Sequence, residues 1–179
     1  MKAWYFSNAD RRLRYGDDRL IEPGTTHTVT CDLVMCEAGL HASKRIMDAL
    51  KYAPGPYVWR VELGGDILKD DDKAVATERT YLWGYDATDV LRDFARRCAL
   101  DVIHLWDAPD VVVEYLETGN EDIRAAARYA TRYAARDAAG AAARDAARAA
   151  AWAAAGAATG DKQNRRLSAM IVANRKGSQ

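Results

Sequence analysis

Hydrophobic and polar positions alternate with a period of two in several short stretches of the first 86 residues. This alternation is typical of β-strands that bury one face. The clearest example is 57–63, in which every odd position is aromatic or aliphatic. Further strands are expected at 2–7, 26–30, 33–36 and 74–83. A short helix is expected at 44–52, with Ser43 as its N-cap and the Pro-Gly-Pro run at 54–56 as its end.

From residue 87 onward the hydrophobic positions recur every three or four residues, which is the period of an amphipathic helix. The pattern predicts a helix that starts at Thr88 and runs to about Leu105, and a shorter one at 110–116 opened by Pro109. An alanine-rich helix is expected at 121–158, where Gly156 and Gly160 are predicted to end it, and a last helix at 162–174.

The alanine-rich run favours a helix because alanine loses no side-chain entropy there. Asn120 is a suitable N-cap. An uninterrupted helix of this length would reach roughly 55 Å, so a bend or break is expected near Gly140. Arginines recur at intervals of four and form a basic stripe with two tyrosines beside it. The stripe and its flanking tyrosines are Arg124, Arg128, Tyr129, Arg132, Tyr133 and Arg136.

Together these patterns predict an α+β fold. Residues 1–86 are expected to form a head with a small mixed or antiparallel sheet, and residues 87–175 a helical region that contains the helix at 121–158. A length of 179 residues suits a single compact domain or a small domain with a helical extension.

The net charge is zero but unevenly distributed, at −6 for the first 120 residues and +6 for the remainder. The overall balance argues against a dedicated DNA-binding protein, although the basic C-terminal part leaves nucleic acid open as a partner. No apolar run is long enough to span a bilayer, and the arginine stripe excludes the alanine helix from one. With no signal peptide and an odd number of three cysteines, a cytoplasmic protein is expected.

Metal chemistry has little support in the spacing of the ligand-type residues. Cys31, Cys36 and His41 are five residues apart, whereas zinc sites bring ligands in closer pairs, and a fourth ligand is missing. We therefore predict no metal site. The phosphate-binding loop, the HExxH zinc motif and the GxSxG nucleophile motif are all absent.

The block at 39–63 reads G-L-H-A-S, then a helix that ends D-A-L-K-Y, a Pro-Gly turn and the strand V-W-R-V-E-L. This order resembles the nicotinamide-pocket segment of the ADP-ribosyltransferase superfamily. The resemblance implies that His41 and Tyr52 sandwich a nicotinamide ring of NAD, with Ser43 beside it and Glu78 as the catalytic glutamate. In the alternative interpretation His41 and Tyr52 are half-buried core residues and Glu78 is a charge at a strand edge.

A second resemblance covers nearly the whole chain. It rests on C-E-A-G-L-H-A-S, D-A-L-K-Y-A-P-G, V-W-R-V-E-L, D-D-K-A-V-A-T-E-R, the alanine- and arginine-rich helix and the closing Q-N-R-R-L. This combination resembles a family of uncharacterised proteins encoded by bacteriophages and prophages. The resemblance implies a small accessory protein that acts in the cytoplasm of an infected bacterium.

Our leading hypothesis from the sequence is an accessory protein that binds, and inhibits, a bacterial host or defence component. The arginine stripe and its tyrosines are the candidate contact residues, because arginine and tyrosine supply much of the energy of protein interfaces. The first alternative is an NAD-binding enzyme or pseudoenzyme that uses His41, Tyr52 and Glu78. A homo-oligomer formed through the alanine faces is a further possibility.

Overall fold

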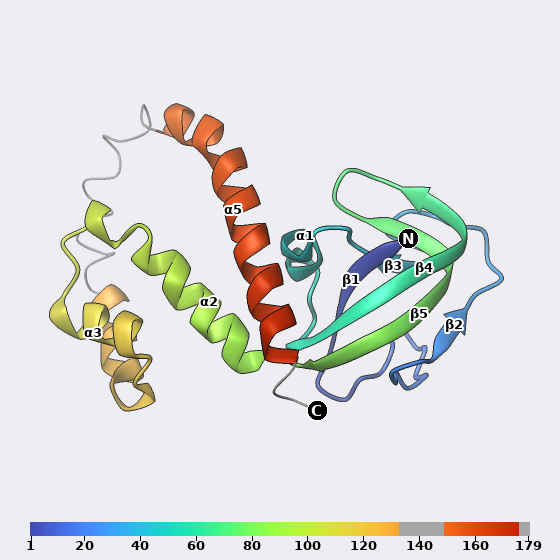
Figure 1. The fold of residues 1–179 in the computed structure, drawn as a ribbon, viewed down its shortest axis with the longest axis horizontal. Helices are drawn as coiled ribbons and strands as arrows, with labels where there is room; N and C mark the ends of the chain where they lie inside the picture. The colour runs from blue at the N-terminus through green and yellow to red at the C-terminus, as the bar shows by residue number, and fades with distance from the viewer. Residues whose placement is uncertain (133–148, 176–179) are drawn as a thin grey trace. The chain divides into compact units, whose positions relative to one another are not determined.

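The computed structural model describes residues 1–132 and 149–175 (Figure 1). Two compact units make up the chain. The sheet unit comprises Met1–Leu91 together with the segment from Asn164 onward, and the helical unit comprises Arg92–Gln163. The predicted α+β fold is confirmed, because an antiparallel sheet comes first and helices follow. The bend expected near Gly140 lies outside the described residues.

The sheet has five strands, in the order β1-β4-β5-β2, with β3 also paired to β5. The strands are β1 Lys2–Ser7, β2 Thr26–Thr28, β3 Leu40–Ala42, β4 Tyr57–Lys69 and β5 Ala74–Asp86. Every pair is antiparallel. The two short strands β2 and β3 follow one another along the same edge of β5, opposite residues 78–80 and 74–76.

A backbone bridge between Trp4 and Ser43 closes this sheet on itself. The N–H of Trp4 donates to the carbonyl of Ser43 at 2.7 Å, and the N–H of Ser43 donates back at 2.9 Å. Strand β1 is therefore paired with β4 on one side and with the residue after β3 on the other. A closed ring of strands leaves fewer unpaired backbone groups than an open sheet does.

Three local predictions for the sheet unit were wrong. Residues 33–36 form no strand but part of a tight loop closed by two bonds between Val34 and Ala38. Ser43 is not a helix cap, because its backbone is held by Trp4, and α1 Ile46–Lys51 begins after Arg45. The strand expected at 57–63 does not end there but continues through Gly64 and Gly65 to Lys69. The register shift between Gly64 and Ile67 marks a bulge, in which Gly65 has a φ of +62°.

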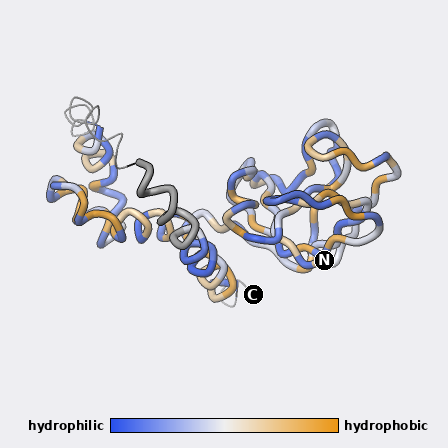
Figure 2. Tube along the Cα trace, turned by 90° about the horizontal axis from the view of Figure 1, so that it is seen from above, coloured by the Kyte–Doolittle hydropathy of each residue, from blue (hydrophilic) through white to orange (hydrophobic). Residues whose placement is uncertain are grey.

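The core of the sheet unit is built from the alternation noted in the sequence. Trp59, Val61 and Leu63 of β4 are almost fully buried, as is Tyr81 of β5. Hydrophobic and hydrophilic segments are interspersed along the chain of the sheet unit (Figure 2). The indole N–H of Trp59 donates to the hydroxyl of Ser7 at 3.0 Å, so the largest buried ring also has its polar atom satisfied.

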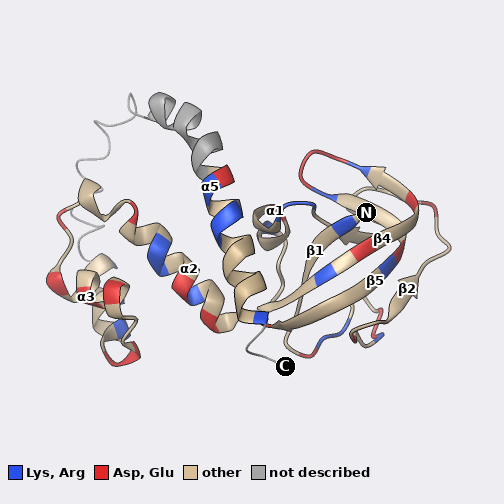
Figure 3. Cartoon of the chain, in the orientation of Figure 1, with Lys and Arg blue, Asp and Glu red and all other residues tan. Residues whose placement is uncertain are grey.

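The helices of the described residues are α1, α2 Thr88–Leu100, α3 Asp110–Thr118 and α5 Ala149–Arg175, with short 3-10 turns at Ile103–Leu105 and Glu121–Ile123. Residues 124–132 are also helical. Asn120 caps the turn at Glu121 as predicted, because its side chain accepts a bond from the N–H of Asp122. Basic and acidic positions both occur on α2 (Figure 3), where Asp93 pairs with Arg96 and Arg97.

Helix α5 does not end at Gly156 or Gly160, so the prediction of a separate last helix was wrong. A glycine in a helix interior costs about 1 kcal/mol relative to alanine, which a helix with good formers around it can absorb. The last turns of α5 belong to the sheet unit. There the hydroxyl of Tyr85 donates to the carbonyl of Ile171 at 2.8 Å, and Arg175 lies over the ring of Trp83.

Candidate ligand pocket

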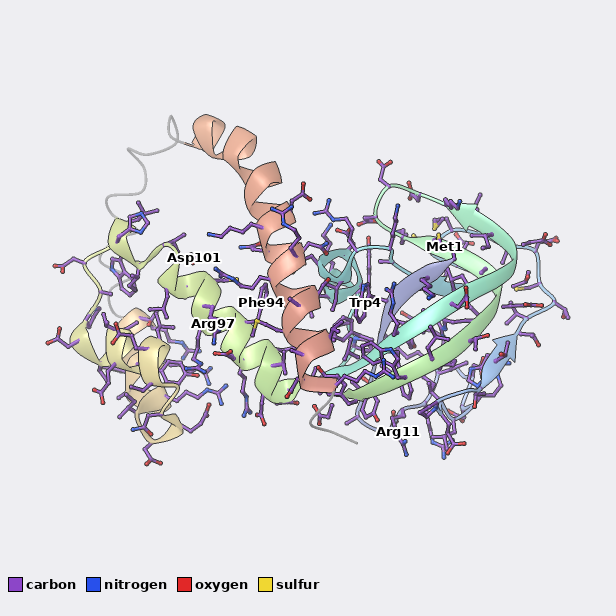
Figure 4. The ribbon with its side chains drawn as sticks, viewed as in Figure 1. Met1, Trp4, Arg11, Phe94, Arg97 and Asp101 are labelled. Carbon is purple, nitrogen blue, oxygen red and sulfur yellow. The ribbon has the colours of Figure 1, made fainter. Side chains whose placement is uncertain are left out.

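The sheet unit contains a pocket of about 420 Å³, which we call the sheet pocket. It is lined from β1, from the loop and strand at 36–43, from the loop at 13–17 and from β5. Several aromatic residues contribute to its wall, and Trp4 of β1 is labelled in Figure 4. The aromatic members of the lining are Trp4, Tyr5, Phe6, Tyr15, His41 and Tyr52. Most ligand pockets in proteins have a volume of about 300–1,000 Å³ and a largely apolar wall.

His41 is held in one orientation by the loop that precedes it. Its Nδ1 lies 3.1 Å from the carbonyl of Gly39, and its Nε2 accepts the N–H of Cys36 at 3.0 Å. Because a carbonyl only accepts, Nδ1 carries the proton, and the ring is the neutral tautomer. Burial lowers the pKa of His41 below its ordinary value. With both nitrogens occupied, the ring face is the part of His41 that is left for a ligand.

Backbone geometry in the loop explains how Cys36 reaches the imidazole. Cys36 has a φ of +69° and Gly39 a φ of +113°, both in the left-handed half of backbone space. A side chain at position 39 would overlap Val75, so only glycine fits this close approach to β5. Glycine at position 39 therefore allows the backbone path that holds the imidazole of His41 in one orientation.

Tyr52 lies at the rim of the sheet pocket, with 49% of its surface exposed. Its hydroxyl donates to Asp72 at 2.8 Å, and the ammonium of Lys73 lies 4.7 Å from its ring centroid. The bond from Tyr52 lowers the pKa of the Asp72 carboxyl. The pKa of Lys73 is raised, first by a hydrogen bond to the thiol of Cys36 and then by the Tyr52 hydroxyl. These contacts anchor the tyrosine ring at the pocket mouth.

Arg79 is a pocket residue that our sequence analysis missed. It is only 2% exposed, and its guanidinium lies 3.8 Å from the ring centroid of Tyr5. It donates to the hydroxyl of Tyr81 from Nε at 2.8 Å and from Nη2 at 2.6 Å, and to the carbonyl of His41 from Nη1. The only signal in the sequence was an arginine at an inward position of a predicted strand, which one unaligned sequence does not distinguish from an edge charge.

The three residues of the ADP-ribosyltransferase resemblance are not all brought together. His41 and Tyr52 both line the sheet pocket, whereas Glu78 does not. Glu78 is exposed, and its side chain lies beside Gly64 on the neighbouring strand. Successive residues of a strand point to opposite faces, so Arg79 faces inward and Glu78 faces away from the pocket. Ser43 also lines the pocket.

The arginine stripe is described as far as Arg132. Arg124 is partly covered and pairs with Glu121 at 3.0 Å, while Arg128, Tyr129 and Arg132 are exposed. Tyr129 is 73% exposed, which is unusual for a large aromatic side chain. Ala127 is buried at 3% exposure, so this helical segment packs one face and presents the other. Tyr133 and Arg136 lie outside the described residues.

Cys31 and Cys36 are exposed free thiols, and Cys98 is half-buried. Within residues 1–132 and 149–175, no group of three or more histidine, cysteine or acidic side chains is arranged to hold a metal ion. The same described part of the chain has no helix with the length and hydropathy needed to cross a bilayer.

Residues 21–93 match a domain of unknown function (DUF7666). This range includes His41, Tyr52 and Arg79 of the sheet pocket but neither β1 nor the alanine-rich helix. No curated protein and no solved structure matches the chain.

Proposed function

We propose that this protein is a ligand-binding protein whose sheet unit holds a small planar molecule in the sheet pocket. The observation that carries the proposal is that His41 and Tyr52 line the same aromatic pocket. Aromatic rings bind planar ligands by stacking on their faces and bind cationic rings through their π electrons. A nicotinamide ring has both properties, so NAD is the first ligand to test.

The geometry favours binding over glycosidic bond cleavage. A transferase of the kind implied by the resemblance needs a carboxylate beside the reacting sugar, and Glu78 lies outside the lining of the pocket. The imidazole of His41 uses both nitrogens in bonds to the protein, so it has no free position for proton transfer. We therefore propose a binding protein or pseudoenzyme in preference to an active transferase.

Calorimetric titration of the full chain with NAD tests this proposal. We expect saturable binding by the wild type and at least a tenfold loss of affinity in both His41→Ala and Tyr52→Ala. His104→Ala is the matched control, because His104 is an exposed histidine of the helical unit and should bind as the wild type does. Absence of NAD binding by the wild type, or equal affinity in all variants, would contradict the proposal.

A second candidate function is capture of a bacterial protein by the exposed part of the arginine stripe. It is favoured by the 73% exposure of Tyr129 between Arg128 and Arg132. A tyrosine flanked by two arginines in solvent is a composition found at interface hot spots. We propose that this surface binds a protein of a bacterial host or its defence, as the resemblance to phage accessory proteins implies.

Charge reversal tests this second function. Arg128→Glu with Arg132→Glu should abolish recovery of a specific partner from bacterial lysate while the far-UV circular dichroism is unchanged. Lys44→Glu with Lys69→Glu is the control, because both lysines are exposed in the sheet unit and make the same change in net charge. If the two double variants recover the partner equally, the exposed part of the arginine stripe is not its binding surface. Sedimentation over a range of concentrations would show whether the protein associates with itself instead.

A further inference from the structure

The floor of the sheet pocket carries a positive charge that no carboxylate neutralises among the described residues. Arg79 is 98% removed from solvent, yet its partners there are the neutral hydroxyl of Tyr81, the carbonyl of His41 and the ring of Tyr5. Moving a charged group out of water costs several kcal/mol unless it is paired. Neutral acceptors and an aromatic face offset part of that cost, and an anion would offset more.

Not every N–H group of the Arg79 guanidinium makes a hydrogen bond within the described residues. Arginine carries five N–H groups in a rigid planar fork. The bonds from Arg79 to residues of the described chain use one N–H on each of its three nitrogens. One N–H of Nη1 and one N–H of Nη2 make no hydrogen bond within the described residues and remain available to a bound anion. Arginine binds phosphate or carboxylate through paired N–H donors.

The other charged residues of the lining add to this preference. Arg14 and Lys73 are positive, and Asp17 and Glu37 are negative. Asp17 is already held by Arg19, which donates to both of its carboxylate oxygens from Nε and Nη2. That pairing lowers the pKa of Asp17. With Asp17 paired to Arg19, the three cations Arg14, Lys73 and Arg79 outnumber the remaining carboxylate of Glu37, so the lining favours a ligand with negative charge.

From these observations we infer that the natural guest of the sheet pocket is a nucleoside monophosphate, with its ring between the aromatic side chains and its phosphate on Arg79. This inference rests on the proposed function, since it names the class of planar ligand. The volume of about 420 Å³ lies in the lower part of the range for ligand pockets. A single buried guanidinium suits one phosphate group, and a pocket of this size suits one nucleoside.

The test compares each of five nucleoside monophosphates with its own nucleoside in calorimetric titrations of the full chain. The probes are the monophosphates of adenosine, guanosine, cytidine and uridine together with nicotinamide mononucleotide. At least one monophosphate is expected to bind ten times more tightly than the nucleoside that lacks the phosphate. Arg79→Gln should remove that preference, and Arg79→Lys, which keeps the charge without the fork, should retain only part of it.

Each result decides between the two proposals. Equal binding of a monophosphate and its nucleoside would overturn the phosphate inference and leave a planar ligand in place. Binding of NAD that depends on His41, without binding of any monophosphate, would also overturn it while the proposed function stands. Because Arg79 is buried, Arg79→Gln must first show wild-type circular dichroism. If that variant does not fold, the wild-type comparison and Arg79→Lys still give the answer.

Discussion

The hydroxyl of Tyr81 lies 3.3 Å from Nδ1 of His27, and the two rings meet edge to face with their centroids 5.2 Å apart. The same hydroxyl accepts two hydrogen bonds from Arg79, so its own proton points to His27. On the far side of the imidazole, Nε2 lies 3.1 Å from the carbonyl of Leu20 and must carry the ring proton. A continuous chain of bonds thus runs from Arg79 through Tyr81 and a neutral His27 to the backbone of residue 20.

This chain of bonds makes stability depend on pH. Burial lowers the pKa of His27 below its ordinary value of 6.5, and the charges of Arg19 and Arg79 lower it further. Burial also lowers the pKa of His41. As the pH falls through 6.5, these histidines become protonated in the unfolded chain while they stay neutral in the folded chain. The free energy of unfolding should therefore fall as the pH drops from 7.5 to 5.5. Urea unfolding at 7.5, 6.5 and 5.5 measures this slope.

Two histidine variants test whether His27 causes this dependence of stability on pH. His27→Gln should reduce the slope between pH 7.5 and 5.5 and leave the part that His41 contributes, whereas His104→Gln, at an exposed position, should leave the wild-type slope unchanged. A wild-type slope in His27→Gln would show that the buried imidazole is not its source.

Removal of the Ser7 hydroxyl should destabilise the sheet unit. Ser7 and Trp59 are both fully buried, and Ser7→Ala leaves the indole N–H without an acceptor. An orphaned buried donor costs about 1–3 kcal/mol. Chemical denaturation followed by tryptophan fluorescence would measure the loss. In a Trp59→Phe background, Ser7→Ala should cost less, because no indole N–H remains to be satisfied, and an equal cost in both backgrounds would contradict the argument.

A side chain at position 84 should also destabilise the sheet. A Cβ on Gly84 would overlap the indole of Trp59 and lie 2.7 Å from the carbonyl oxygen of Val58. Overpacking of this kind costs about 1–3 kcal/mol. We expect Gly84→Ala to lower the free energy of unfolding by that amount, which chemical denaturation would measure. Leu82→Ala on the same strand removes a side chain that is 36% exposed, so it should cost less, and the reverse order would argue against close packing at Gly84.

The C-terminal turns of α5 should contribute strongly to stability. Ile171 is fully buried while its neighbour Val172 is 46% exposed. Truncation of a buried isoleucine to alanine costs about 2–5 kcal/mol, whereas exposed positions change stability by about 0.5 kcal/mol or less. Ile171→Ala should therefore shift the thermal midpoint by several degrees, and Val172→Ala should leave it almost unchanged. Similar shifts for the two would show that this helix face is not packed.

Glu78→Gln should leave ligand affinity within twofold of the wild type. The carboxylate lies outside the lining of the sheet pocket and is exposed to solvent, so removal of its charge changes little inside. Calorimetry with NAD and with nucleoside monophosphates gives the comparison. A tenfold or larger change would place Glu78 in the ligand site and revive the transferase interpretation.

Much of the fold was predictable because its periods are local. The alternation at 57–63 and the three-to-four spacing after residue 87 depend on neighbouring residues alone, and both predictions were confirmed, by β4 and by α2. Predictions about where elements end were weaker. In the sequence Ser43 is a suitable helix cap. In the structure its backbone is bonded to that of Trp4, 39 positions away, and no sequence pattern near Ser43 indicates this bridge.

The sequence by itself determined the α+β division and the main strands, since these follow from residue type and short-range spacing, whereas His41 and Tyr52 were singled out only by a family resemblance. Only the tertiary structure decided that the strands close into a ring, that Arg79 lies under the pocket and that Glu78 lies outside it. The physical reason is the pairing register. The pairing of Gly64 with Glu78 belongs to the register that fixes which residues of β5 face inward, and the bridge between Trp4 and Ser43 closes the ring. Both join segments that the linear pattern does not connect.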